Sequence, residues 1–195
     1  MCFISAIILA AGESKRMGNS KLLLKWGETS IFERTVDNYL ASMANEVCVI
    51  LGDRAAEMDK LLGDRSVTVA LNPAYSKGMS TSIVTGINTM SPRTEGIMLA
   101  LADQPLITNQ TIDRLIQVFQ QKKKGIVVPT YHGQKGNPVI FNIKYREALL
   151  GLKGDTGGRE IVQRCYTDVQ EVPVDDRGVL IDIDTPDDYR RQNPG

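Results

Sequence analysis

The stretch LAAGESKRMGNSK, Leu9 to Lys21, carries Gly12, Arg16, Gly18 and Lys21 directly after an apolar run. Glycines let a backbone turn tightly and approach a ligand closely, and free backbone N–H groups can surround an anion. Arg16 and Lys21 can neutralise phosphate charge, the first as a fork and the second as a point charge. The stretch lacks the GK[ST] ending of a P-loop. Its spacing alone fits a phosphate-binding loop and an ordinary solvated strand–helix loop about equally.

Carboxylates stand in two further segments, LALADQP (99–105) and VLIDIDTPDDY (179–189). Asp103 ends a run of small apolar residues, and a carboxylate at the end of a strand can bind Mg²⁺ together with phosphates. By itself, Asp103 fits an Asx-turn or a helix cap somewhat better. Alternation along residues 179–183 predicts a strand with Asp182 and Asp184 on one face. Carboxylates gathered near Asp103 would need a cation or protons to coexist.

A fourth segment, NPAYSKGMSTSI (72–83), contains Gly78 followed by a helix that opens with small hydroxyl residues, Ser80 and Ser82 among them. Small hydroxyls and free N–H groups at such a turn could read the edge of a nucleobase. A simple helix cap explains the same residues, and the sequence alone favours that simpler interpretation.

These segments follow short apolar runs that alternate with helical patterns. Continuous apolar runs are typical of strands covered on both faces. We expect strands at Phe3–Leu9, Val47–Leu51, Val67–Leu71, Ile97–Ala102, Ile126–Pro129, Val139–Phe141, Val169–Val174 and Val179–Ile183. We expect helices from Ser30, with Glu33 completing a capping box, at Ala55–Leu62, at Ser80–Met90, after Thr108, at Gly157–Cys165 and at Pro186–Arg191.

The alternation predicts an α/β fold. We expect one domain over residues 1–195, a Rossmann-like three-layer sandwich with a mostly parallel sheet. The pattern loosens after Gly125, where we expect an antiparallel strand. In open parallel sheets ligands bind at the carboxyl ends of the strands, which is where all four segments would lie.

The composition excludes several classes of protein. The 23 basic and 23 acidic residues cancel, which argues against a general nucleic-acid or membrane-surface binder. No stretch approaches the ~20 apolar residues that span a membrane. The three cysteines are scattered and form no CxxC pair, which fits a reducing cytoplasm.

Taken together, the segments resemble the MobA-like nucleotidyltransferases, and within them the molybdenum cofactor cytidylyltransferases. The first stretch looks like the LAAGxSxRMGxxKxLLxxxG signature, and LADQP looks like the LADxP metal motif. KGNPVIF, GDTGGRE and DIDTPDDY look like the later GxPVxF, GDxGxR and DIDTPxDY segments. The resemblance covers nearly the whole chain and implies the fold of the nucleotide-diphospho-sugar transferases.

The resemblance also implies roles for individual positions. Arg16, Lys21 and Asp103 would be catalytic, and Mg²⁺ would be held by Asp103 and Asp184 with Asp182. The acceptor would lie against the later segments. The implied nucleotide-binding residues are Leu9, Ala10, Ala11, Gly12, Arg16, Lys21, Gly78, Ser80 and Ser82; the implied acceptor-binding residues are Asn137, Asp155, Gly157 and Arg159.

The activity implied is transfer of CMP from CTP to the phosphate of a molybdopterin-type cofactor, with a molybdoenzyme as a potential recipient of the product. Two features bear on this choice. Asn137 stands where cytidylyltransferases of the family often have histidine, which leaves the acceptor open. The SKGMSTSI turn is less rich in proline than in guanylyltransferases, which favours CTP. The alternatives are guanylyl transfer to the same cofactor, cytidylyl transfer to a sugar or polyol phosphate, and a non-catalytic cofactor-binding assembly factor.

Overall fold

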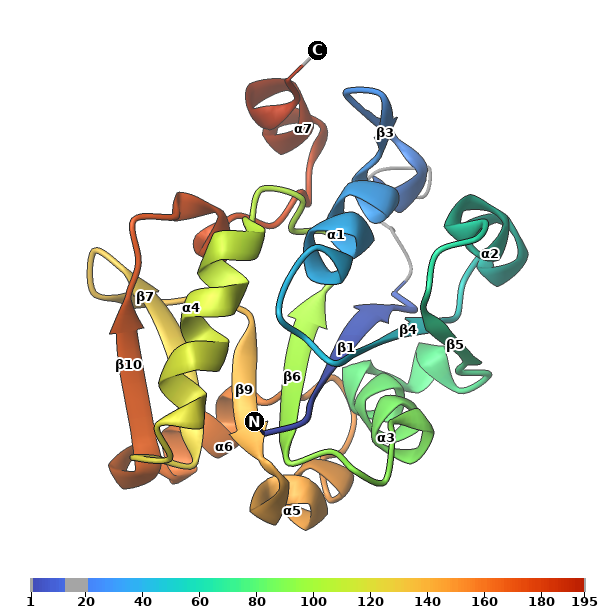
Figure 1. Ribbon diagram of the computed structural model, residues 1–195. Helices are drawn as coiled ribbons and strands as arrows, with labels where there is room; N and C mark the ends of the chain where they lie inside the picture. Colours follow the sequence, from blue (N-terminus) through green and yellow to red (C-terminus); the bar gives the residue numbers. More distant parts are fainter. Residues whose placement is uncertain (1, 13–20, 195) are drawn as a thin grey trace.

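The computed structural model describes residues 2–12 and 21–194 of the chain, so Arg16 lies outside the described residues. Its centre is a sheet whose strands form one continuous order, with a further strand, β8 (Gln134–Lys135), paired to β7. Figure 1 shows this sheet with β10 and β5 at its two edges. The order is β10 (Val169–Pro173), β7 (Ile126–Tyr131), β9 (Val139–Asn142), β6 (Gly96–Leu101), β1 (Ile4–Ala10), β4 (Glu46–Leu51) and β5 (Thr68–Leu71).

The strand directions confirm the predicted fold class. β1 runs parallel to β4 and β6, β4 is parallel to β5, and β10 is parallel to β7. β9 lies antiparallel between β6 and β7, and β8 is antiparallel to β7. The antiparallel strand expected after Gly125 is therefore β9, and the carboxyl ends of β1, β4 and β6 meet at one edge of the sheet.

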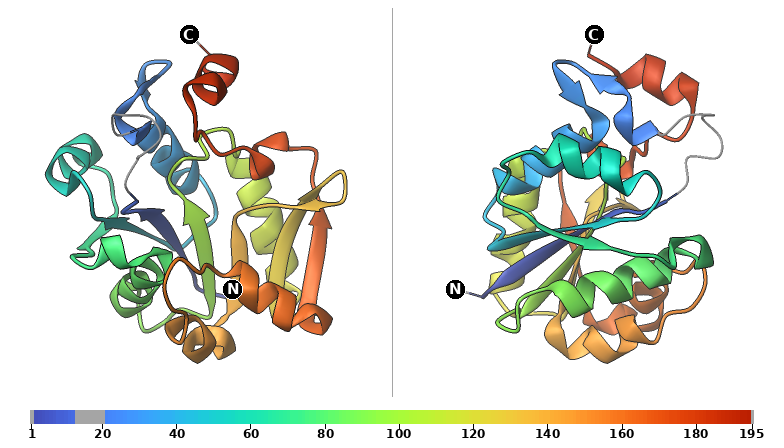
Figure 2. Two further views of the ribbon diagram at one scale, coloured as in Figure 1. Left: turned by 180° about the vertical axis from the view of Figure 1, so that it is seen from behind. Right: turned by 90° about the vertical axis from the view of Figure 1, so that its right-hand side faces the viewer.

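Helices cover both faces of the sheet, as the edge-on view on the right of Figure 2 shows. One face carries α1 (Ile31–Leu40), α2 (Ala55–Leu62) and α4 (Asn109–Gln120), and the other carries α3 (Met79–Thr89), α5 (Arg146–Leu150) and α6 (Arg159–Arg164). Neighbouring residues of β1 pack into the hydrophobic cores on opposite faces of the sheet, because successive side chains of a strand point to opposite faces. Ile8 packs with the α1 side and Ile7 with the α3 side, both fully buried.

The helix starts follow the predicted caps. Ser30 accepts a hydrogen bond from the Glu33 backbone N–H, and the Glu33 side chain accepts from the Ser30 N–H, which is the expected capping box. Thr108 caps α4 by a single bond, since its hydroxyl accepts a hydrogen bond from the Thr111 N–H. Thr185 and Asp188 form a second capping box at α7 (Pro186–Gln192). These local contacts fix where the helices begin.

One predicted strand is wrong. Val179–Ile183 forms a 3₁₀ turn, η5 (Arg177–Leu180), followed by an extended segment that lies outside the sheet. The turn forms because the Asp176 carboxylate accepts a hydrogen bond from the Gly178 N–H at 2.8 Å. The segment then crosses the loop after β6, where the Ile183 N–H donates to the Asp103 carbonyl at 3.0 Å.

The sequence patterns also missed several short elements. A two-stranded hairpin, β2 (Lys25–Trp26) and β3 (Thr29–Ser30), contacts α7 through Trp26 and Tyr189 at the top of Figure 1. The remaining 3₁₀ turns are η1 (Lys21–Leu23), η2 (Tyr75–Lys77), η3 (Ile143–Tyr145) and η4 (Tyr166–Asp168). Over residues 2–12 and 21–194, no helix is long and apolar enough to cross a membrane.

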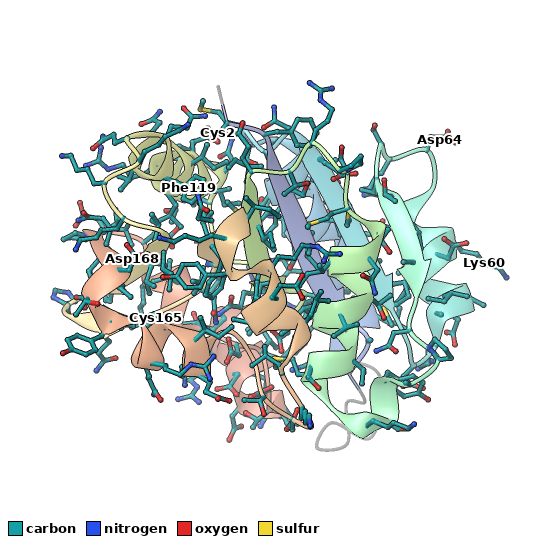
Figure 3. The ribbon with its side chains drawn as sticks, turned by 90° about the horizontal axis from the view of Figure 1, so that it is seen from below. Cys2, Lys60, Asp64, Phe119, Cys165 and Asp168 are labelled. Carbon is teal, nitrogen blue, oxygen red and sulfur yellow. The ribbon has the colours of Figure 1, made fainter. Side chains whose placement is uncertain are left out.

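Asp168 sits at the amino ends of β7 and β10, far from the edge where the predicted site residues lie, and is labelled in the view from below (Figure 3). It accepts hydrogen bonds from the Tyr145 hydroxyl at 2.6 Å and from the Gly125 N–H at 3.0 Å. The Lys144 Nζ atom lies 2.8 Å from Asp168 Oδ2 and forms an ion pair with it. Hydrogen bonds from Lys144 and Tyr145 lower the pKa of Asp168 to about 2.

Candidate active site

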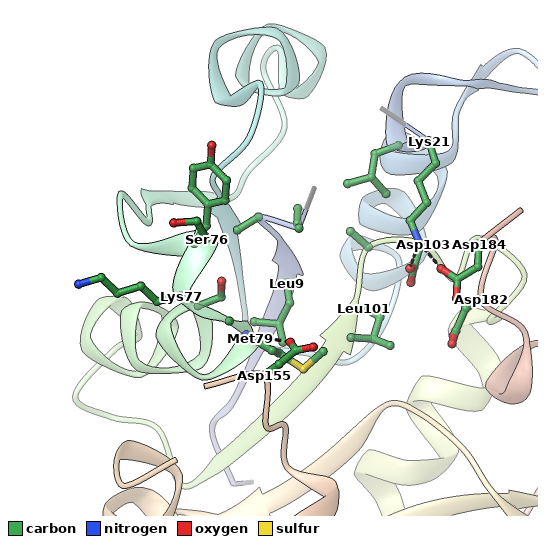
Figure 4. A pocket seen from close by; sticks show the side chains of 18 residues that line it. Leu9, Lys21, Ser76, Lys77, Met79, Leu101, Asp103, Asp155, Asp182 and Asp184 are labelled. Atoms are coloured by element: carbon green, nitrogen blue, oxygen red, sulfur yellow. Dashed lines mark hydrogen bonds and ion pairs between the residues drawn. The ribbon is translucent and has the colours of Figure 1, made fainter. Parts of the chain in front are cut away.

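A pocket of about 710 Å³ opens at the carboxyl ends of β1 and β6. Figure 4 shows its two sides, with Ser76 and Lys77 on one and Lys21, Asp103 and Asp184 on the other. All four sequence segments contribute to it. The pocket therefore lies where a parallel sheet is expected to bind a ligand.

The end of β1 and the two residues that follow it form one side of the pocket, which we call its floor. Leu9, Ala10, Ala11 and Gly12 all line it, and their contact with a nucleotide stays a prediction. Gly52, which the sequence patterns missed, lets the neighbouring loops approach, since a Cβ there would lie 2.7 Å from the Ala11 carbonyl oxygen. Ala10, Ala11 and Gly12 carry at most a methyl group, so a ligand can approach the backbone along this part of the floor.

Lys21 reaches into the pocket from η1 and lies between two carboxylates. Its Nζ is 2.5 Å from Asp103 Oδ2 and 2.6 Å from Asp184 Oδ1. The side chain is 15% exposed. Burial alone would lower the pKa of Lys21, but Asp103 and Asp184 outweigh it and the pKa is raised. Lys21 is accordingly a fixed positive charge at neutral pH.

Asp103 is placed by the contacts of the loop after β6. Thr35 of α1 donates its hydroxyl proton to the Ala102 carbonyl at 3.0 Å, and Asn38 binds the Pro105 carbonyl at 3.1 Å. Asp103 Oδ2 faces Lys21, whereas Asp103 Oδ1 is buried without a hydrogen-bond partner among the described residues. A buried carboxylate oxygen left without a partner is costly, which points to a group that the protein binds there.

Asp182 has a different partner, which the sequence did not reveal. Gln104 is almost fully buried, and its side-chain amide donates to Asp182 Oδ1 at 2.7 Å. Partial loss of hydration at the carboxyl, with the charge of Asp103, raises the pKa of Asp182 to about 6, against the opposing hydrogen bond from Gln104. Asp182 lines the pocket beside Asp184 but is held apart from the Lys21 contact.

The donor set fits a hard divalent cation. Two carboxylate oxygens already converge on one point, the Lys21 ammonium, and Asp103 offers a second, unpaired oxygen. Mg²⁺ and Mn²⁺ prefer oxygen ligands, and Mg²⁺ is usually held by one or two carboxylates plus phosphates and waters. Within residues 2–12 and 21–194, no three His, Cys, Asp or Glu side chains are grouped as a metal site. The use of Asp182 as a third ligand therefore stays a prediction.

The opposite wall is built where two distant loops meet. The backbone N–H and hydroxyl of Ser80 both donate to the Gly154 carbonyl, at 3.2 and 2.8 Å. The Met79 N–H donates to Asp155 Oδ1 at 3.3 Å. Gly78 has a φ of +111°, and a Cβ there would overlap the Gly154 carbonyl group. The 153–158 loop therefore packs directly against the first residues of α3.

The predicted residues on this wall divide into two groups. Gly78, Ser82 and Asp155 line the pocket. Ser80 is buried and, like Asn137, Gly157 and Arg159, lies outside the lining. Tyr75, Ser76, Lys77 and Met79 line the wall although none was singled out beforehand; all four belong to the NPAYSKGMSTSI segment, so the segment was the available signal.

The sequence also matches a known protein family. Residues 6–171 match the MobA-like NTP transferase domain. The chain belongs to the MobA-like NTP transferase family. Its members and this chain are nucleotidyltransferases, and the family uses divalent metals. The matched range ends before Asp182 and Asp184, which the structure places in the pocket lining.

Two curated relatives are similar over almost their whole length. The molybdenum cofactor cytidylyltransferase of Escherichia coli (strain K12) is 27% identical over 97% of this chain and 95% of its own. The purine catabolism protein PucB of Bacillus subtilis (strain 168) is 26% identical over 96% of this chain and 94% of its own.

Solved structures show the same fold. Rv0371c from Mycobacterium tuberculosis H37Rv superposes with a TM-score of 0.90 at 30% identity, covering 100% of this chain and 98% of that one. A second structure of Rv0371c is a complex with manganese, with a TM-score of 0.85 at 29% identity, covering 98% of each chain.

Proposed function

We propose that this nucleotidyltransferase transfers CMP from CTP to the terminal phosphate of a molybdopterin-type cofactor and releases pyrophosphate. The observation that carries the proposal is the convergence of Lys21, Asp103 and Asp184 beside a pocket floored by Leu9–Gly12. The similarity to a molybdenum cofactor cytidylyltransferase over 97% of the chain supports the choice of substrates.

Each part of the pocket has a proposed task. The backbone of Leu9, Ala10, Ala11 and Gly12 would contact the base and ribose, with Gly78, Ser80 and Ser82 closing the nucleotide side; Ser82 already accepts a hydrogen bond from Asn72 at 2.9 Å, which fixes its hydroxyl. Lys21, together with Arg16, would hold the triphosphate and balance its charge.

Asp103 and Asp184, with Asp182, would hold Mg²⁺, which when bound neutralises phosphate oxygens and stabilises charge on the leaving pyrophosphate. The remaining chemistry needs little from the protein. A phosphate monoester has its second pKa near ~6 and is already largely dianionic at pH 7, so no general base is required. The single histidine, His132, is exposed and stands outside the pocket lining, in keeping with this.

The acceptor is proposed to lie on the β9 and α6 side of the pocket. Asp155 is at the pocket wall; Asn137 comes from the loop before β9, Gly157 from the 153–158 loop and Arg159 from the first position of α6, all outside the pocket lining. The two curated relatives carry different names, one for a cytidylyltransferase and one for purine catabolism. The molybdopterin-type acceptor is therefore the most specific part of the proposal.

We propose that the domain spans residues 1–195, because the C-terminal segment supplies Asp182 and Asp184 and its helix α7 packs on the β2–β3 hairpin. We also propose a cytoplasmic location. It is supported by the three cysteines, all free and two of them buried.

Pyrophosphate release from each of the four nucleoside triphosphates, with Mg²⁺ and with or without molybdenum cofactor, tests the proposal. The expected result is release from CTP that requires the cofactor. Release from GTP but not CTP would replace the cytidylyl donor with a guanylyl donor, and release from none would favour a non-catalytic assembly factor.

A further inference from the structure

The Lys21 ammonium occupies the point at which the Asp103 and Asp184 carboxylates converge. Its Nζ lies 2.5 Å from one carboxylate oxygen and 2.6 Å from the other. Mg²⁺ binds carboxylate oxygens at roughly 2.0–2.1 Å, so a cation that used the same two oxygens would lie within about the space of this nitrogen. Lys21 and a divalent cation cannot both use these two oxygens at once.

The ion pair with Lys21 satisfies only one of the two carboxylate oxygens of Asp103. Its Oδ2 is paired with Lys21, but its Oδ1 is buried and has no hydrogen-bond partner among the described residues. A purely structural salt bridge is expected to satisfy both oxygens of a buried carboxylate. Among the described residues, the Asp103 Oδ1 atom therefore stays available to a further positively charged group.

The Asp182 carboxylate has a different partner from Lys21. Gln104 holds it through a 2.7 Å hydrogen bond, and the Ile183 N–H fixes this segment to the Asp103 carbonyl at 3.0 Å. The backbone of Asp103 and the carboxylate next to Asp184 are thus held by the fold, whereas Lys21 reaches Asp103 and Asp184 through a flexible four-carbon side chain. Lys21 has the longest side chain of the three groups in this contact, so it is the one that we expect to move.

We propose that Lys21 is the resident counter-cation of the metal site: in the metal-free protein its ammonium neutralises Asp103 and Asp184, and divalent metal binding at these carboxylates requires Lys21 to move toward the triphosphate. This inference rests on the proposed function, because the triphosphate gives Lys21 its second partner. Metal and triphosphate then each favour the binding of the other, by the same factor.

Mn²⁺ binding without nucleotide tests the inference. Free Mn²⁺ is measured by electron paramagnetic resonance on chelator-treated protein, comparing wild type with Lys21→Met. Without the resident charge, we expect Lys21→Met to bind Mn²⁺ at least tenfold more tightly than wild type. Lys21→Arg keeps the charge and should stay within about twofold of wild type. An equal or weaker affinity in Lys21→Met would overturn the inference.

Controls separate this effect from misfolding and from general charge. Lys25→Met removes an exposed lysine four positions away and should leave Mn²⁺ affinity unchanged; a tenfold gain there would refute a local role for Lys21. Asp103→Asn should abolish binding at this site. If Lys21→Met does not fold without metal, Lys21→Gln, which keeps hydrogen bonding without charge, is expected to show the same gain.

A CTP arm distinguishes the two proposals. If neither CTP nor GTP binds, but Lys21→Met binds Mn²⁺ more tightly, the proposed function fails and the counter-cation role stands. If CTP is turned over by wild type while Lys21→Met gains no Mn²⁺ affinity, the function stands and the counter-cation role fails.

Discussion

Gly78→Ala tests how the pocket wall is built. Gly78 joins η2 to α3 with φ +111° and ψ 169°, a backbone region that only glycine adopts readily. A Cβ at this position would overlap the Gly154 carbonyl carbon and oxygen, which belong to the loop that also binds Ser80. The substitution therefore adds backbone strain and displaces a second loop.

The expected cost has two parts. Forcing an alanine into this backbone region costs about 1–3 kcal/mol, and inserting a methyl group into a packed contact costs about 1–3 kcal/mol more. Gly63→Ala is the matched control, because Gly63 has φ +52° but open space around its Cβ position. Gly63→Ala should therefore lose only the stability that corresponds to backbone strain.

Urea unfolding followed by circular dichroism measures both variants. We expect Gly78→Ala to be about 1–3 kcal/mol less stable than Gly63→Ala, with weaker CTP binding in the Gly78 variant alone. Equal stability of the two variants, with CTP binding intact, would refute the packing of the 153–158 loop on α3.

Three further predictions concern separate groups. Asp103→Asn should lower the rate of nucleotidyl transfer by about 100- to 1,000-fold, measured as kcat for pyrophosphate release, because one stabiliser of developing charge is lost; a rate near wild type would remove Asp103 from the site. Asp176→Ala should cost about 2–3 kcal/mol in urea unfolding, because its carboxylate accepts hydrogen bonds from Gly178 and from the start of α4; an unchanged midpoint would contradict that anchoring. Asp168→Asn should lose about 2 kcal/mol at pH 7, and the difference from wild type should shrink as pH falls from the ordinary value of 3.8 through about 2, since a lowered carboxyl pKa stabilises the fold only above these values; a difference independent of pH would contradict the shift.

Much of the fold could be predicted because its signals are local. The buried strands are continuous apolar runs, and the starts of α1 and α4 are set by caps within four residues. The failed strand at Val179–Ile183 shows the limit of this approach. Its alternating pattern is real, since Ile183 is buried and Asp182 and Asp184 line the pocket. Whether such a segment joins a sheet depends on Asp176 and Asp103, which the pattern does not include.

Part of the pocket lining was predictable, but its internal pairing was not. The loops after β1 and β6 could be expected to bring Lys21 and Asp103 together, because the carboxyl ends of parallel strands meet at one edge. Asp184 reaches the same place from a segment outside the sheet, so the strand predicted before it was the wrong reason for its position. The pairing of Lys21 with these two carboxylates spans 82 and 163 residues of sequence, so it is decided by how the loops pack. The contact of Gln104 with Asp182 and the docking of Gly154 on Ser80 depend on tertiary structure in the same way.

Transfer of label from α-³²P-CTP to molybdenum cofactor tests the central claim most directly. With Mg²⁺ present, we predict that wild-type protein yields a labelled cofactor–CMP product together with one pyrophosphate per transfer, and that Asp103→Asn yields neither at a comparable rate. Labelled product from α-³²P-GTP but not from α-³²P-CTP would contradict the claim, and so would CTP consumption that leaves the cofactor unlabelled.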